Sequence, residues 1–498
     1  MSKTIFEKHS PGRRGYTLPE NDVPINLDDC IPQKYRRKEK IRLPEVSELD
    51  VMRHFIGLSH KNHFIEKGFY PLGSCTMKYN PKIHETLAAD NNFRMLHPKQ
   101  PEETAQGALE ILYELQKDLS EIGGMANATV QPLAGAQGEF TGLKIIEAYH
   151  RHKGNTQKDT VLIPDSAHGT NPASAALAGY KAVEIPSDAE GKVNIKKLRE
   201  ICDDKVAGFM VTNPNTLGLF ENQIKEISEI IHSVDGLIYM DGANMNALLG
   251  LVQPGKIGFD ILHYNLHKTM STPHGGGGPG SGPIAVKEEL VKFLPVPLIS
   301  KKDDKYFFDY SHKETSIGKV HSFFGNFAVN LRAYAYIKTL GAEGMLDIST
   351  NAIINANYVR VKLAPYYEVP YNKLCMHEFI ASGNIQKKKY GIKTLDIAKR
   401  LLDKGYHAPT VYFPLIVHEA MMIEPTETES MGTLDCFIKA MIEIAEECEK
   451  NPEVVKNAPH NTPVRRVDDT RAVRQLDTKF EWNSEESCGG KCSCNCNE

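Results

Sequence analysis

The chain has 498 residues, far more than one domain needs to bury a core of its own. Hydrophobic residues make up 41%, charged residues 24%, and the formal net charge is -4, so no basic excess favours nucleic acid or an acidic membrane surface. The first residues contain no apolar signal-peptide core, and no apolar stretch approaches the roughly 18 to 20 residues that span a bilayer. We therefore expect a cytoplasmic globular protein whose partners are neither nucleic acids nor membranes.

The ten cysteines fall into two groups. Six are scattered without metal-ligand spacing, which is typical of reduced thiols. The other four lie between Cys488 and Cys496 on a polar, glycine-containing tail. The tail can be a soft-metal or redox-active segment, or a disordered extension whose thiols have no essential role. We assign no metal site to the protein.

The beginning of the chain, residues 1–100, is predicted to be an arm followed by helices. Its first 48 residues are rich in proline, charge and turn residues, which indicates an extended arm lying on another protein surface. Residues 45–67 then show apolar side chains with helical spacing.

Residues 101–330 are predicted to form the large domain, in which helices alternate with short apolar strands. Such strands argue for an α/β fold with a mostly parallel sheet covered on both faces. Residues 331–480 mix helix and strand as a smaller α+β C-terminal domain does, and residues 481–498 are the cysteine-rich tail. The expected helices are 104–122, 138–150 and 326–340, and the expected strands are 160–164, 206–211 and 237–240.

Three loops of the large domain carry polar or small residues at positions where a ligand can bind, since ligands gather at the carboxyl ends of parallel strands. The small-residue turn at Gly135 feeds a helix and suits a phosphate, although a plain turn has the same composition. His168 follows a strand, where its flat ring can lie over a cofactor ring. Asn213 ends the next strand and can donate a hydrogen bond, or belong to a turn driven by Pro214 and Gly218.

Asp241 and Lys268 carry the most specific signal. Asp241 ends a strand without a cationic neighbour in the sequence, and Lys268 follows another strand 27 residues later, before a glycine-rich run. A lysine amine can form a Schiff base with the aldehyde of pyridoxal 5'-phosphate, and a carboxylate can keep the cofactor's ring nitrogen protonated. The glycine run lacks the Gly-Lys-Ser/Thr ending of a P-loop, so it does not favour a nucleoside triphosphate.

The order of phosphate turn, histidine, asparagine, aspartate and lysine resembles the aspartate-aminotransferase-like superfamily, fold type I of the pyridoxal-phosphate enzymes. Across residues 40–460 the chain is similar, more closely, to the P-protein family of the glycine cleavage system. The segments that carry this resemblance are 69–78, 135–139, 167–172, 265–283, 407–410 and 424–427.

The resemblance implies an oxidoreductase that decarboxylates glycine, releases CO2 and transfers the aminomethyl group to the lipoyl arm of the H-protein. Single-chain members are about twice this length, so the chain resembles the separate lysine-bearing subunit. That subunit is expected to pair with a homologous subunit 1 in a heterotetramer with two of each. The tail after Trp482 is not part of the family pattern.

The resemblance also assigns roles to individual residues. Lys268, His168 and Asp241 are the expected catalytic residues: anchor of the cofactor, stacking ring and partner of the ring nitrogen. The N–H groups of Ala136 and Gln137, with His267, are expected to bind the phosphate, Asn213 the phenolic oxygen, and Ala243 also belongs to the cofactor site. The candidates for binding the glycine carboxylate are Ser74, Thr76, Arg332 and His377, of which Arg332 is equally suited to a surface ion pair.

Two alternatives remain open at this stage. One is a different fold type I enzyme, such as a cysteine desulfurase or an amino-acid decarboxylase that needs no lipoyl partner. The other is a non-catalytic scaffold that binds the H-protein. Lys268 argues against the scaffold, and the absence of a reactive-cysteine loop after the lysine argues against the desulfurase.

Overall fold

The computed structural model describes residues 3–39, 41–276 and 278–482. The chain divides into two compact units, Met1–Phe64 with His460–Glu498, and Ile65–Pro459. The predicted domain boundaries near residues 100, 330 and 480 stay predictions. The four tail cysteines lie outside the described residues.

The larger unit is built on a seven-stranded sheet with the order β1-β7-β6-β5-β4-β2-β3. The strands β3, β2, β4, β5 and β6 are parallel, and β7 runs antiparallel to both β6 and β1. The mostly parallel sheet expected from the alternation of helices and strands is confirmed. The strand bounds are β1 (Asn127–Thr129), β2 (Thr160–Pro164), β3 (Lys181–Ile185), β4 (Val206–Thr212), β5 (Leu237–Gly242), β6 (Ile261–Tyr264) and β7 (Ile284–Val286).

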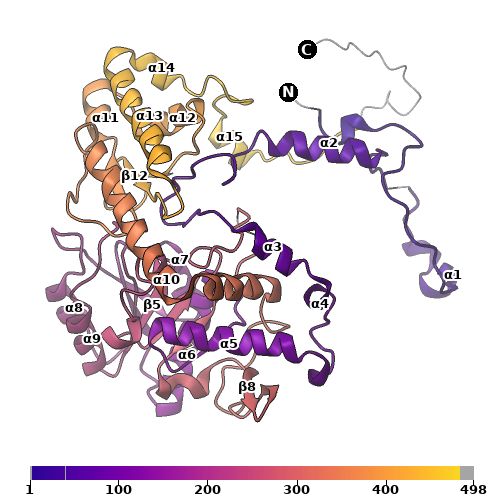
Figure 1. The fold of residues 1–498 in the computed structure, drawn as a ribbon, viewed down its shortest axis with the longest axis horizontal. Helices are drawn as coiled ribbons and strands as arrows, with labels where there is room; N and C mark the ends of the chain where they lie inside the picture. The colour runs from indigo at the N-terminus through magenta and orange to yellow at the C-terminus, as the bar shows by residue number, and fades with distance from the viewer. Residues whose placement is uncertain (1–2, 40, 277, 483–498) are drawn as a thin grey trace. The chain divides into compact units, whose positions relative to one another are not determined.

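Helices surround this sheet (Figure 1), and alternate side chains of its central strands enter two different cores, one on each face. On β5, Ile238 and Met240 pack in one core, whereas Leu237 and Tyr239 pack in the other. This period of two is the side-chain geometry of a strand. The first core contains residues of α5 (Gln106–Gly123), α8 (Ile195–Ile201) and α9 (Ile224–Ser233), and the second those of α6 (Gly135–Lys153) and α7 (Thr170–Leu177).

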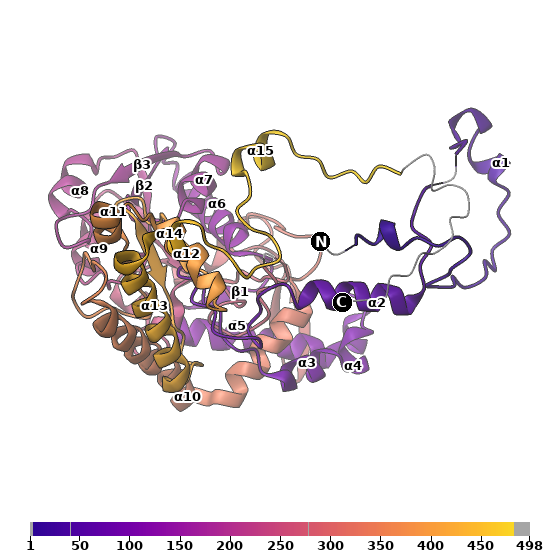
Figure 2. The ribbon, with the colours of Figure 1, turned by 90° about the horizontal axis from the view of Figure 1, so that it is seen from above.

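The second half of the larger unit begins with α10 (Phe327–Leu363), in which two helices meet at a kink after residue 340, where the helix predicted over 326–340 ends. Its backbone leaves helical geometry at Gly341, where φ is 62°. Beyond it, β10 (Phe379–Ser382) and β11 (Thr410–Val411) both pair antiparallel with β12 (Ala420–Ile423). Figure 2 shows helices gathered beside α10. They are α11 (Asn384–Tyr390), α12 (Thr394–Asp403), α13 (Met431–Lys450) and α14 (Pro452–Lys456).

Three further elements of the larger unit pack near its edges. The hairpin of β8 (Leu298–Lys302) and β9 (Lys305–Asp309) contacts α5, and α3 (Lys82–Ala88) contacts α10. The short α4 (Asn91–Arg94) begins at Asp90, whose side chain accepts the Asn92 N–H as helix caps commonly do.

The smaller unit contains the helices α1 (Leu27–Cys30), α2 (Glu48–Ser59) and α15 (Asp469–Arg474). α2 begins after Ser47, whose side chain accepts the Asp50 N–H. An early and a late segment of the chain meet within this unit, where the rings of Phe6 and Phe480 stack with centroids 4.9 Å apart. Across the described part of the chain, helices long and apolar enough to cross a membrane are absent.

Candidate active site

Asp241 and Lys268 belong to one edge of the sheet. β5 and β6 are parallel neighbours in which Asp241 is paired with His263 and Gly242 with Tyr264. Asp241 therefore lies at the carboxyl end of β5, and Lys268 lies four residues beyond the end of β6. The same edge receives the loops that follow β2 and β4, which carry His168 and Asn213. Strand register thus gathers residues separated by up to 100 positions in the sequence.

These loops enclose a cavity of about 300 Å³, a volume at the lower end of small-molecule sites. Among the residues with predicted roles, seven line it: Ser74, Ala136, His168, Asp241, Ala243, His267 and Lys268. Lys268 Nζ donates a hydrogen bond to the Ser74 carbonyl at 2.9 Å. Ser74 itself has a φ of 62°, a backbone strain of the kind that concentrates at functional sites.

Asp241 is 3% exposed, and polar groups surround its carboxylate. It accepts hydrogen bonds from Asn171 Nδ2 at 3.0 Å and from the Ala243 N–H at 2.9 Å. The ring of His263 lies beside it, with Nε2 3.4 Å from Oδ1. Burial raises the pKa of Asp241, but His263 and the two hydrogen bonds outweigh burial and keep the pKa below its usual value. Asp241 is therefore an anion at neutral pH.

Two neighbouring side chains hold the ring of His263 in place. Its Nδ1 lies 2.6 Å from the Tyr239 hydroxyl, and its Nε2 lies 2.7 Å from Asn265 Nδ2. Burial lowers the pKa of His263, and the Asp241 carboxylate beside it acts in the opposite direction. The Tyr239, His263 and Asp241 side chains form a buried chain of polar groups that ends at the cavity.

The phosphate turn is the amino end of α6. The first bond of this helix runs from the Gly138 N–H to the Ala134 carbonyl, which leaves the N–H groups of Ala136 and Gln137 without an acceptor inside the helix. A Cβ on Gly282 would meet the Ala134 carbonyl at 2.1 Å, so the glycine-rich run packs directly against this turn. The Gln137 side chain secures the turn by accepting the Leu133 N–H and donating to the Val320 carbonyl.

Of the four histidines that line the cavity, His168 and His267, which have predicted roles, are both neutral at pH 7. Burial and the Lys268 charge lower the pKa of His168, and they lower that of His267 to about 3. His267 Nδ1 accepts the Ser281 N–H at 3.3 Å, which leaves its Nε2 as an N–H donor. The His168 ring is solvent-exposed in the cavity and meets Phe413 edge-on, with centroids 5.6 Å apart.

Asn213 does not line the cavity but lies buried behind it. Its Oδ1 accepts the Glu221 N–H at 3.0 Å, and among the described residues its Nδ2 has no hydrogen-bond acceptor. An unpaired buried amide is unfavourable by about 1–3 kcal/mol. Asn213 therefore keeps a donor available, which is the capacity that its predicted role requires.

Three of the four carboxylate candidates lie outside the set of lining residues. Thr76 donates its hydroxyl to Glu424, and His377 is fully buried. Arg332 forms a two-pronged ion pair with Glu85, with Nε to Oε1 at 2.9 Å and Nη2 to Oε2 at 2.7 Å. Ser74 alone contributes to the cavity wall.

The sequence did not single out four buried groups near the cavity. Glu139 on α6 accepts the hydroxyls of Thr170 and Ser174, and burial beside Asp241 raises its pKa to about 7. The other three are His263, Glu378 and Glu424. Three of the four stood inside or beside positions already recognised, because Glu139 ends the segment 135–139, Glu424 opens the segment 424–427 and Glu378 follows His377.

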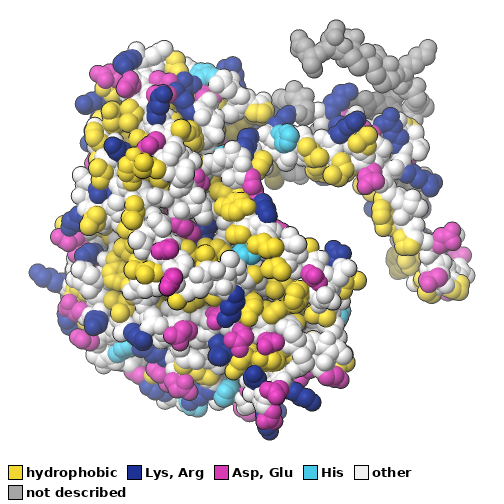
Figure 3. Space-filling model, in the orientation of Figure 1, with side chains coloured by type: hydrophobic (Ala, Val, Ile, Leu, Met, Phe, Trp, Pro, Cys, Tyr) yellow, Lys and Arg dark blue, Asp and Glu magenta, His cyan; other side chains and the backbone are white. Residues whose placement is uncertain are grey.

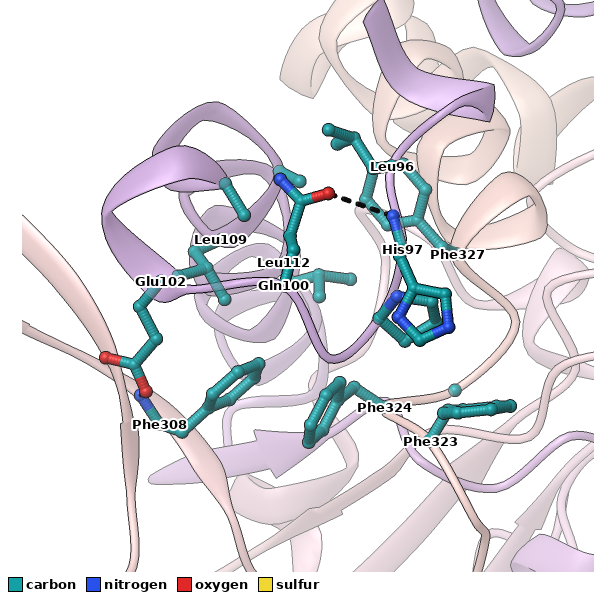
Figure 4. A pocket seen from close by; sticks show the side chains of 14 residues that line it. Leu96, His97, Gln100, Glu102, Leu109, Leu112, Phe308, Phe323, Phe324 and Phe327 are labelled. Atoms are coloured by element: carbon teal, nitrogen blue, oxygen red, sulfur yellow. Dashed lines mark hydrogen bonds between the residues drawn. The ribbon is translucent and has the colours of Figure 1, made fainter.

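A second pocket lies between α5 and the segment before α10 and is mainly apolar (Figure 4). Phe308 and Phe324 stack in it with centroids 4.0 Å apart. Its polar groups bond locally, since Glu102 accepts the Phe308 N–H and Gln100 accepts the His97 N–H. With a volume of about 100 Å³ it is smaller than typical cofactor sites, so the polar cavity is the candidate active site.

The donor set of the polar cavity fits pyridoxal phosphate. Three kinds of group come together there. They are an amine for the aldehyde, an ionised buried carboxylate for the ring nitrogen, and free N–H groups at a helix start for the phosphate. A buried carboxylate without a full cationic partner is costly unless a ligand completes its environment. Lys268 would hold the group, Asp241 its nitrogen, and Ala136, Gln137 and His267 its phosphate.

Comparisons with known proteins give one consistent result. The family model "Glycine cleavage system P-protein" matches residues 20–307, and "Glycine dehydrogenase, C-terminal domain" matches residues 348–465. A relative from Caldanaerobacter subterraneus subsp. tengcongensis is 56% identical over 94% of this chain and 97% of its own length, and one from Listeria innocua is 55% identical over 96% and 98%. Both are described as "Probable glycine dehydrogenase (decarboxylating) subunit 2".

Solved structures extend the likeness to the fold. A glycine decarboxylase (P-protein) of the glycine cleavage system has a TM-score of 0.71 at 22% identity, over 84% of this chain and 94% of that chain. The glutamate decarboxylase of Lactobacillus brevis has a TM-score of 0.63 at 11% identity, over 84% and 97%. The predicted fold type I architecture is confirmed. The family match and the full-length relatives together establish that the chain belongs to the glycine cleavage system P-protein family.

Proposed function

We propose that this chain is the lysine-bearing subunit of a two-subunit P-protein, which decarboxylates glycine and passes the aminomethyl group to the lipoyl arm of the H-protein. Family membership makes the chain a pyridoxal-phosphate-dependent glycine decarboxylase. The observation that carries the proposal is the convergence of the Lys268 amine and the ionised Asp241 carboxylate in one cavity. The family match leaves no support for the desulfurase or the scaffold.

Each residue of the site has a separate proposed role. Bound pyridoxal phosphate supplies an electron sink for the electron pair left when CO2 departs. Lys268 would hold the cofactor aldehyde, and Asp241 would keep the proton on the ring nitrogen. His168 would stack on the ring, while the N–H groups of Ala136 and Gln137 and the His267 Nε2–H would bind the phosphate. Asn213 donates to the phenolic oxygen, and the Ala243 N–H fixes Asp241 in place.

The glycine carboxylate must be held without being bound so tightly that its loss is resisted. We retain Ser74, Thr76, Arg332 and His377 as the candidates for this role. Ser74 is the best supported, because it lines the cavity and its carbonyl accepts the Lys268 amine. Arg332 is the least supported, since Glu85 already occupies both edges of its guanidinium group.

A protein partner is supported by the apolar surface of the smaller unit. The helix α2 exposes Leu49, Met52, Phe55 and Ile56, each with about half of its surface free, and Figure 3 shows hydrophobic side chains along this helix. Contiguous exposed apolar surface commonly marks a protein interface. We propose that a homologous subunit 1 covers it in an assembly with two of each subunit.

A cytoplasmic setting is proposed too, in keeping with the six free cysteines of the described residues.

Reconstitution tests this proposal. The cofactor-loaded chain is mixed with its candidate partner subunit and lipoylated H-protein, and glycine-dependent exchange of labelled bicarbonate into the glycine carboxylate is followed. We expect exchange only when all three proteins and the cofactor are present. H-protein without its lipoyl group is the matched control. Absence of exchange in the complete mixture, with the cofactor demonstrably bound, contradicts the proposed function.

A further inference from the structure

Two buried glutamates face each other close enough to Lys268 to feel its charge. β10 and β12 are antiparallel, and Phe379 is paired with Ile423. Glu378 immediately precedes the first of these residues and Glu424 immediately follows the second, so the register places the two glutamates opposite each other. Both are at most 1% exposed.

Each carboxylate has one oxygen engaged and one free. Glu378 Oε2 accepts the Ser74 N–H at 2.7 Å, and Glu424 accepts the Thr76 hydroxyl through Oε1. Glu378 Oε1 and Glu424 Oε2 have no hydrogen-bond partner among the described residues, and neither ring nitrogen of His377 has one. One nitrogen of His377 and one oxygen of each glutamate lie within 4.8 Å of one another. The cluster therefore has free acceptors and lacks a positive group of its own.

The two carboxylates together can carry two negative charges, but one positive charge acts on both of them. Lys268 is the cation that acts on both carboxylates, whereas Lys78 is already paired with Glu427 at 2.7 Å. Burial lowers the pKa of His377 to about 3, which keeps its ring neutral, and burial raises the pKa of the Cys75 thiol to about 11. Burial and mutual repulsion raise the pKa of the glutamates, so two negative charges do not persist there at neutral pH.

The proposed reaction consumes a proton. The glycine methylene carbon forms a bond to one sulfur of the lipoyl disulfide, the bond to the carboxylate breaks to release CO2, and the S–S bond breaks with its electron pair passing to the second sulfur. That sulfur must gain a proton to become a thiol. Cys75 is too weak an acid to supply it, and Glu139 lies on the Asp241 side with both oxygens bonded to hydroxyls.

We propose that Glu378 and Glu424 share a single proton and deliver it to the sulfur that leaves when the disulfide is cleaved. After delivery, both carboxylates are ionised beside Lys268, and the pair regains a proton from solvent before the next turnover. His377 closes the cluster on its buried side as a neutral ring. The delivery step rests on the proposed function, whereas the shared proton does not.

The shared proton is tested by infrared spectroscopy of the cofactor-loaded full chain, labelled with 13C-glutamate and held at mildly alkaline pH. We expect a protonated-carboxyl band equivalent to one side chain, lost in Glu424→Gln and shifted in Glu378→Gln, where burial keeps the remaining Glu424 carboxyl protonated. Glu139→Gln is the matched control, because its carboxyl is also buried at the cavity but must leave this band intact. An identical spectrum for wild type and both pair variants overturns the shared proton.

A bound cation is the competing explanation for three free ligand atoms in one place, and it is tested with the metal alone. Chelator-treated protein is titrated with Mn²⁺ or Zn²⁺, and retained metal is measured together with the infrared band. We expect no stoichiometric metal uptake that depends on the pair. Uptake of one ion, lost in Glu424→Gln and accompanied by loss of the band, overturns the proposal in favour of a metal site.

Delivery of the proton is tested by single-turnover transfer to lipoylated H-protein. Removing a general acid slows the chemical step by about 10²- to 10⁴-fold, so we expect that loss in both glutamine variants. Glycine affinity and the cofactor's absorption spectrum should be unchanged, which a merely structural role would not predict. The wild-type rate should fall as pH rises and the pair ionises, and Glu424→Gln should lack this fall. Glu424→Asp, which keeps the acid, should recover part of the rate.

The outcomes separate the two claims. Equal losses of glycine affinity and transfer rate indicate a binding role and overturn proton delivery. Unchanged transfer rates in both glutamine variants overturn it as well. If the wild-type protein shows the shared proton but transfers nothing to the H-protein, the proposed function and the delivery step fail together while the shared proton stands.

Discussion

Two buried groups of polar side chains lie near Lys268: the sheet-edge wall around Asp241, and a second wall around Glu378 and Glu424 that lies behind Ser74. They differ in how completely their polar groups are paired. At the sheet edge, Asp241 accepts two hydrogen bonds and lies beside His263, which is itself bonded to Tyr239 and Asn265. In the second wall, His377 has no hydrogen bond to the described residues, and Glu378 and Glu424 each leave one oxygen free.

Asp241 therefore carries a constant charge, whereas the Glu378 and Glu424 pair can gain or lose a proton. A carboxylate surrounded by donors is held in one ionisation state, which suits a group that must keep a cofactor nitrogen protonated throughout turnover. Two facing carboxylates that share a proton can change state at little cost, which suits proton transfer. Substitutions in the two walls should therefore have different consequences.

Among the substitutions outside the glutamate pair, Asp241→Asn should have the largest effect on activity. The substitution keeps the shape of the side chain but removes the negative charge that stabilises the protonated ring nitrogen. Loss of one preorganised electrostatic partner lowers turnover by about 10²- to 10³-fold. Bicarbonate exchange in the reconstituted system measures the loss, with bound cofactor determined separately. Exchange within a factor of two of wild type would remove Asp241 from the proposed mechanism.

His263→Leu and His377→Leu compare the two walls through stability. His263→Leu leaves the Tyr239 hydroxyl and the Asn265 amide without this hydrogen-bond partner. Each buried group left unpaired should lower the free energy of unfolding by about 1–3 kcal/mol. His377→Leu breaks no hydrogen bond within the described chain, so the free energy of unfolding should change by less than about 1 kcal/mol. Urea unfolding of the two variants is the measurement. Equal destabilisation would contradict the contrast between paired and unpaired walls.

Gly282→Ala tests the close approach of the glycine-rich run to the phosphate turn. The added Cβ meets the Ala134 carbonyl at 2.1 Å, and such overpacking destabilises a protein by about 1–3 kcal/mol. Cofactor affinity should fall as well, because the turn carries the Ala136 N–H. Gly169→Ala is the control, since a Cβ there meets nothing within 4 Å. Equal affinity for pyridoxal phosphate in both variants would show that the close packing is dispensable.

Arg332→Gln should have the smallest effect. Partly exposed ion pairs contribute about 0–1 kcal/mol, so loss of the Glu85 pair should reduce stability only slightly. The apparent KM for glycine should stay unchanged if Glu85 is the true partner of Arg332. A large rise in KM, with normal cofactor binding, would instead favour the sequence-based proposal that Arg332 binds the glycine carboxylate.

The sequence predicted the sheet-edge wall well. Apolar strands of four to seven residues end within four residues of His168, Asn213, Asp241 and Lys268, and parallel strands bring their carboxyl ends together. The start of the phosphate helix was predicted three residues late, at 138 instead of Gly135. Small residues at a helix start carry little apolar periodicity, so the pattern could not mark the first turn.

The wall around Glu378 and Glu424 could not be predicted in the same way. Ser74, Thr76, Glu378 and Glu424 come from segments about 50 to 350 positions apart, and they meet only through the packing of β10 and β12 against the loop that carries Ser74. A glutamate in a strand-end motif looks the same whether it is exposed or buried. The pairing of two such residues depends on an antiparallel register that the sequence pattern did not reveal.

The most direct test of the central claim is to locate the cofactor on the chain. The cofactor-loaded protein is reduced with borohydride, digested and analysed by mass spectrometry. We predict a phosphopyridoxyl group on the peptide that contains Lys268, and no such adduct or visible cofactor absorption band in Lys268→Ala. An adduct on another lysine, or a wild-type protein that carries no adduct after incubation with pyridoxal phosphate, would contradict the account.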